Sequence, residues 1–166
     1  MARIDAGQID VLNAVVSRLQ EVLDLTDRQC YPVAREQDVP SIPVGGDYWL
    51  TVAPGDGTFE PEEQVEGNIT ENAEITVTAY TRIKTDSTGH DRYLLMDNAR
   101  GLLSIKKNIL AALCGHDLAT TGGDVFLRQW LHAKRASAPD LASAGRDGNV
   151  FGVIRVTFGV IFDWRL

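Results

Sequence analysis

Residues 149–166, NVFGVIRVTFGVIFDWRL, form the stretch that decides how the rest of this sequence can fold. Every second residue from Ile154 to Trp164 is apolar, and the residues between them are mixed. This alternation of β-branched and aromatic side chains predicts one half-buried β-strand. At about 3.3 Å per residue the strand would span on the order of 50 Å. We therefore expect it to bend, at Gly152 or Gly159.

Three earlier segments have the composition of partner strands. Residues 73–83 alternate between an apolar and a polar row, which predicts a strand with one face on the core. Residues 47–53 show the same alternation, and residues 30–35 predict a short edge strand because they contain a proline. Residues 125–137 predict one further strand, connected to the long strand by residues 138–148.

Two segments have the apolar spacing of amphipathic helices, residues 5–25 and residues 91–114. Each carries one apolar stripe that can cover a sheet. In the second segment Leu103 belongs to the stripe, and Gly101 lies inside the predicted helix at a cost of about 1 kcal/mol relative to alanine. Gly115 is the expected C-terminal cap.

The order of these elements, α-β-β-β-α-β-β, predicts a two-layer α+β fold. A mostly antiparallel sheet would carry both main helices on one face. The length of 166 residues fits a single domain over residues 1–166. The other sheet face is then left with apolar side chains that usually mark an interface, unless long loops fold back over it. The candidate interface residues are Trp49, Trp130, Phe151, Val153 and Ile161. We expect a glutamate at Val153 or Ile161 to leave the fold intact and to weaken self-assembly.

Residues 54–72 are acidic and contain glycine and proline but no basic residue. Their carboxylates are Asp56, Glu60, Glu62, Glu63, Glu66 and Glu71. The spacing does not follow the calcium-loop pattern, so a solvated acidic loop is favoured over a metal site. A loop of this length is usually functional or disordered, and we expect it to be mobile in the isolated subunit.

The sequence contains no signature of catalysis. Neither the three histidines nor Cys30 and Cys114 follow a metal-binding or nucleophile pattern, and no phosphate-binding loop is present. We therefore predict no catalytic, cofactor-binding or metal-binding residue. The net charge of −7 argues against broad binding to nucleic acid or to anionic membranes. No apolar run approaches the roughly 20 residues of a membrane span, and the absence of an N-terminal signal pattern suggests a cytoplasmic protein.

The order of elements resembles one known family. An amphipathic helix is followed by a hairpin with an acidic loop, then by EITVTAYTRIK at residues 74–84 and NARGLLSIKKNILAAL at residues 98–113. A strand and the final GVIRVTFGVIFDW, residues 152–164, complete the pattern. Together these segments resemble the tail terminator (tail completion, minor tail) proteins of long-tailed phages. Members of that family are small α+β proteins that form hexameric rings, which cap the tail tube, stop its polymerisation and join it to the head.

The resemblance implies a structural protein of the virion tail, assembled in the host cytoplasm, with no enzymatic activity. Its partners would be its own copies in a ring, the tail tube protein and a head–tail connector protein. DNA would pass through the ring without specific binding, and the acidic carboxylates would line that lumen or contact a partner. Two alternatives remain open, namely another neck or connector protein, or an α+β domain that binds a small ligand or is an enzyme.

Overall fold

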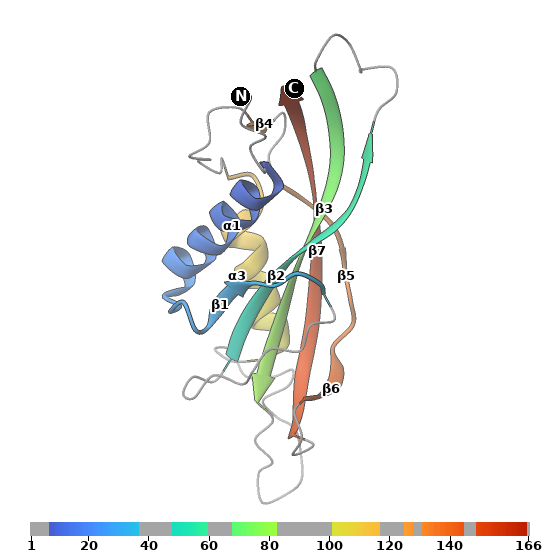
Figure 1. Ribbon diagram of the computed structural model, residues 1–166. Helices are drawn as coiled ribbons and strands as arrows, with labels where there is room; N and C mark the ends of the chain where they lie inside the picture. The colour runs from blue at the N-terminus through green and yellow to red at the C-terminus, as the bar shows by residue number, and fades with distance from the viewer. Residues whose placement is uncertain are drawn as a thin grey trace, which may run out of the picture.

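A twisted seven-stranded sheet organises the part of the chain that the structure describes, and two helices lie against one of its faces (Figure 1). The computed structural model describes residues 7–36, 48–59, 68–82, 101–116, 125–127, 131–144 and 149–165. The helices are α1 (Gly7–Leu23) and α3 (Leu102–Leu113). The strands are β1 (Cys30–Pro32), β2 (Tyr48–Phe59), β3 (Asn68–Arg82), β4 (Val125–Leu127), β5 (His132–Ala136), β6 (Asp140–Ala144) and β7 (Asn149–Arg165). The predicted α+β class with two helices on a mostly antiparallel sheet is confirmed.

Strand β7 is the long strand predicted from the sequence, and it lies at the centre of the sheet. On one side it pairs with the whole of β3, from Phe151 opposite Arg82 to Arg165 opposite Asn68. On its other side β6, β5 and β4 follow one another along its length, all antiparallel. Beyond β3 the order continues through β2 to β1, and only the β1–β2 pair is parallel. The long strand β7 thus pairs with four other strands along its length.

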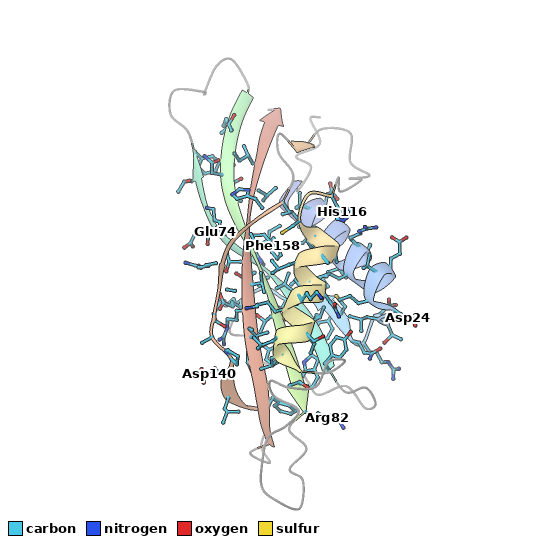
Figure 2. The ribbon with its side chains drawn as sticks, turned by 180° about the vertical axis from the view of Figure 1, so that it is seen from behind. Asp24, Glu74, Arg82, His116, Asp140 and Phe158 are labelled. Atoms are coloured by element: carbon cyan, nitrogen blue, oxygen red, sulfur yellow. The ribbon has the colours of Figure 1, made fainter. Side chains whose placement is uncertain are left out.

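The two helices bury their apolar stripes against the same face of the sheet. Their buried residues are Val11, Leu12, Val15, Val16 and Leu19 in α1, and Leu102, Ile105, Ile109, Ala112 and Leu113 in α3. They join one core cluster with alternate residues of β2, β3 and β7. Phe158 of β7 lies in this layer, between the sheet and α3 (Figure 2). This face is the inner face of the sheet.

The prediction that Leu103 belongs to the core is wrong, because its side chain is 43% exposed while Leu102 is fully buried. Successive residues of a helix are about 100° apart, so the two leucines cannot both face the sheet. Gly101 is also not inside the helix: its extended backbone (φ −66°, ψ 144°) makes it the N-cap of α3. The expected cap at Gly115 is confirmed by its positive φ of 72° just after the helix. Residues 91–100 lie outside the described residues.

The predicted loop at residues 54–72 is wrong at both ends. Residues 54–59 belong to β2 and residues 68–72 to β3, and the two strands remain paired as far as Phe59 opposite Glu71. The register shifts between Pro54 and Gly57, so the glycines and the proline of this stretch form a bulge rather than a loop. In Figure 1 the end of β2, the beginning of β3 and the end of β7 extend beyond the two helices. These are the distal parts of the three strands. Residues 60–67 lie outside the described residues.

Residues 125–144 hold three strands where the sequence predicted one strand and a connection. Strands β4 and β5 fall within the predicted strand 125–137, and β6 lies in the predicted connection. The reason is the length of β7, which offers more edge than one short strand can cover. The predicted edge strand at residues 30–35 is confirmed as β1, which is shorter and ends at Pro32.

Candidate functional site on the outer face and edges of the sheet

The sheet face opposite the helices, here the outer face, carries an aromatic cluster near one end. Trp49 of β2 stacks on Tyr80 of β3 with ring centroids 5.4 Å apart, and it meets Phe151 of β7 edge-on at 5.0 Å. Val153 completes the cluster, and it lies directly opposite Tyr80. All four side chains are at most 4% exposed. The cluster is therefore a second small core.

The premise that Trp49, Phe151 and Val153 are exposed on this face is wrong. Their exposed fractions are 1%, 3% and 1% in the single chain, because they pack on one another across three adjacent strands. Ile161 is half-buried, and Trp130 lies outside the described residues. Participation of these residues in an interface stays a prediction, and of the four that the structure describes only Ile161 is partly exposed in the isolated chain.

Residues 33–36, which follow β1, cross the outer face of the sheet and cover part of it (Figure 1). The Val33 amide donates to the Val52 carbonyl at 2.9 Å, and further along the Arg155 Nε lies 2.9 Å from a Glu36 carboxylate oxygen. Because Arg155 is on β7 and β1 is at the far edge, this ion pair fastens the crossing segment over β2 and β3. This ion pair could not be predicted from the sequence, since the two residues are far apart in the chain.

The polar row predicted for β3 is present but not solvated. Thr76, Thr78 and Thr157 are at most 4% exposed, and the Thr76 and Thr157 hydroxyls are 3.3 Å apart. Threonine suits such a row because its methyl group packs on neighbouring strands. The Thr78 hydroxyl is buried and has no hydrogen-bond partner among the described residues.

A charged cluster lies farther along the outer face, where β5 borders the sheet. The Glu74 carboxylate on β3 accepts from Lys134 Nζ at 3.3 Å and from Arg135 Nη2 at 3.2 Å (Figure 2). These cations belong to β5, so the contacts reach over β7, where Gly159 lies opposite Glu74. A Cβ on Gly159 would come within 2.6 Å of the His132 ring and 2.8 Å of Lys134 Cε. Gly159 was predicted as a bend; its missing side chain is what leaves room for this bridge.

The acidic residues at positions 56–71 do not form one set among the described residues. Asp56 is exposed on β2, whereas Glu71 is only 7% exposed and sits on β3 opposite Phe59. Glu60, Glu62, Glu63 and Glu66 lie outside the described residues. The burial of Glu71 does not fit a solvated loop, while a lumen or partner contact for this acidic region stays a prediction.

Several stretches of sheet edge are exposed in the described chain: β5, the end of β2, and β6, which pairs only with β7 and whose Asp140 and Leu141 are exposed. All five side chains of β5 are exposed, and β5 pairs with β7 on one side only. Residues 56–59 of β2 are exposed as well, and they extend beyond the three-residue pairing with β1. Within the described residues, no strand lies against the far side of these stretches. Unpaired edges of this kind can take up a strand from another chain.

The described side chains offer little chemistry besides packing and charge. Burial raises the pKa of the Cys30 thiol to about 12, so the thiol stays protonated and unreactive at neutral pH. Cys114 is free and exposed. In the described ranges no cluster of three or more His, Cys, Asp or Glu is arranged to hold a metal ion. None of the described helices has the length and apolar character needed to cross a membrane.

Comparison with known proteins gives a likeness in structure. No family model matches the sequence, and no curated protein matches it either. Among solved structures, a chain in the structure titled "Virion of native gene transfer agent (GTA) particle" superposes with a TM-score of 0.58. The identity is 16%, and the alignment covers 96% of this chain and 98% of the other. At this identity the likeness shows a shared fold over nearly the whole chain.

Proposed function

We propose that this protein is a structural component of a phage-like virion, without enzymatic activity, and that it acts as a ring-forming tail terminator. The observation that carries the proposal is the fold shared, over 96% of the chain, with a chain of a gene transfer agent virion. The order of elements that resembles tail terminators supports the finer assignment. The ring would cap the tail tube, stop its polymerisation and join the tail to the head.

The physical properties of the chain suit this role. A ring subunit needs two different surfaces that are complementary and whose rotation closes, and the sheet has exposed edge segments on two different strands. The net charge of −7 suits a channel that lets DNA pass without holding it. The partners in this proposal are further copies of the chain, the tail tube protein and a head–tail connector protein.

The test combines native mass spectrometry with electron microscopy of the purified protein, alone and mixed with polymerising tail tube protein. We expect a closed ring of about six copies, found at tube ends, and tubes that stop growing. A ring that binds a connector protein and ignores tubes would instead support a different neck protein. A monomer that binds neither would overturn the virion proposal.

A further inference from the structure

Two of the exposed edge stretches, β5 and the end of β2, differ in charge. Strand β5 carries His132, Lys134 and Arg135 and no acidic residue. The distal part of β2 carries Asp56 and no basic residue. In the sequence, the next eight residues, 60–67, contain four glutamates and no Lys or Arg. Arg135 keeps 69% of its side chain exposed even while it contacts Glu74, so β5 still presents positive charge to a neighbour.

Like edges are poor partners for each other. Two β5 strands side by side would bring four cations together, and two distal β2 strands would bring their acidic residues together, which is unfavourable across a strand pair. One β5 against one distal β2 instead places opposite charges side by side. The edges therefore select a head-to-tail contact over a two-fold contact, and head-to-tail contacts are those that build rings.

We propose that neighbouring copies associate by pairing distal β2, residues 56–59, of one copy with β5 of the next. This inference rests on the proposed ring and identifies its interface. Main-chain hydrogen bonds between the two edges supply the contact, as when a strand is added to an exposed sheet edge. The sheets of successive copies then continue into one another, and the charges fix which edges meet.

Disulfide trapping in mixed samples tests the pairing directly. In a Cys114→Ser background, one preparation carries Thr58→Cys on β2 and another carries Ala136→Cys on β5; both positions are exposed. We expect disulfide-linked dimers after mixing and mild oxidation, at least tenfold above either preparation alone. As a control, Ala136→Cys is mixed with Asn13→Cys, an exposed position on α1.

A charge substitution gives a second and independent readout. Asp56→Lys should weaken assembly at least tenfold by light scattering, whereas the same change at exposed Asp27, in the turn after α1, should leave it unchanged. Circular dichroism of both variants checks that the fold is kept.

The outcomes separate this inference from the proposed function. Rings that form without crosslinks between positions 58 and 136, and that tolerate Asp56→Lys, would overturn the edge pairing and leave the ring proposal intact. Crosslinks within a single preparation would show like edges in contact and would also overturn it. Absence of both rings and crosslinks would overturn the two proposals together.

Discussion

At the scale of single residues, Gly159 of β7 shows the effect of a missing side chain: Glu74 of β3 can reach across β7 to the cations of β5. The atoms nearest to a Cβ on Gly159 are the far ends of the His132 and Lys134 side chains, which can swing away. A Cβ on Gly55 would instead lie 2.8 Å from the Glu74 Cβ and 3.1 Å from its carbonyl oxygen, which cannot move without shifting β3.

We therefore expect Gly55→Ala to lower the free energy of unfolding by about 1–3 kcal/mol, the usual range for overpacking. Gly159→Ala should cost less than about 1 kcal/mol, because it displaces exposed side chains and an ion pair that solvent already screens. Urea denaturation of the two variants compares them directly. A larger loss for Gly159→Ala would contradict the view that its neighbours are free to move.

Cys30 allows a prediction about pH. Its pKa in the folded protein is raised from 9.0 to about 12 by burial. Below pH 9 the thiol is protonated in both states and has no effect on the balance. Above pH 9 the unfolded chain loses this proton and the folded chain keeps it, so the free energy of unfolding falls by up to about 1.4 kcal/mol per pH unit.

The measurement is the difference between the parent and Cys30→Ala, which lacks the thiol, in denaturation between pH 8 and pH 10.5. We expect the advantage of the parent over the variant to shrink as pH rises above 9. Tyr31, whose pKa burial also raises, remains in both proteins and cancels in the difference. Burial and the nearby Cys30 thiolate both raise the pKa of Tyr48, so the measured difference also contains the coupling between Cys30 and Tyr48. A gap that stays constant would mean that Cys30 ionises in the folded state as freely as in the unfolded chain.

Residue-level prediction from the sequence succeeded where neighbours in the chain decide the outcome. Alternation alone placed Leu50 and Val52 on the inner face and Trp49 on the outer face, as the structure shows. The Glu74 cluster and the Arg155–Glu36 ion pair could not be predicted, because each depends on the register between strands that are distant in sequence.

At the scale of elements, α3 offers a matched pair of substitutions on adjacent residues. Leu102 is fully buried and Leu103 is 43% exposed. Leu102→Ala should cost about 2–5 kcal/mol, because it removes buried methyl groups and leaves a cavity. Leu103→Ala should cost less than about 1 kcal/mol. Equal losses in thermal or urea unfolding would mean that the helix is rotated from its described position.

The distal hairpin leads to a second prediction, which reverses the expectation of mobility at its strand ends. Residues 68–72 of β3 lie beside β7, and from Glu71 onward β3 is paired on both sides. Their amides should therefore exchange with solvent about as slowly as those of residues 73–82. Hydrogen exchange of the isolated subunit, with the turn at residues 24–28 as a fast-exchanging reference, provides the measurement. Fast exchange at residues 68–72 would show that this part of the hairpin opens on its own.

The elements that the sequence predicted well are those with long uninterrupted periodicity, namely α1, β3 and β7. The distal part of β2 was missed because Pro54, Gly55 and Gly57 are typical of turns, and only the long partner strand keeps them extended. Strand β6 was missed because DLASA has weak strand propensity, and its pairing with residues 149–153 of β7 decides its conformation.

At the scale of the whole molecule, two cores hold the sheet from both sides. The larger core joins α1 and α3 to the inner face, and the aromatic cluster of Trp49, Tyr80, Phe151 and Val153 covers one end of the outer face. Among the described residues of the sheet, the surface that remains for assembly is therefore the strand edges and the outer face near Ile161, rather than the whole apolar face inferred from the sequence.

Because part of the outer face is buried, a glutamate at Val153 and a glutamate at Ile161 are expected to have different effects. Val153 is 1% exposed inside a cluster with three aromatic side chains, so Val153→Glu would bury a carboxylate among them. We expect a loss of about 3 kcal/mol or more, a large share of the roughly 5–15 kcal/mol that stabilises a typical domain. Ile161 is half-buried in the distal part of β7, opposite Asn72, where a glutamate can reach water.

Ile161→Glu should therefore keep the circular dichroism spectrum and the unfolding midpoint close to those of the parent, and reduce assembly at least tenfold if this part of the outer face meets a neighbour. Ile9→Glu is the matched control, because Ile9 is 56% exposed on α1. Light scattering and denaturation of the three variants then separate folding from association. A Val153→Glu protein as stable as the parent would show that the aromatic cluster opens readily. Assembly of Ile161→Glu equal to that of Ile9→Glu would remove this surface and leave the strand edges as the place where copies meet.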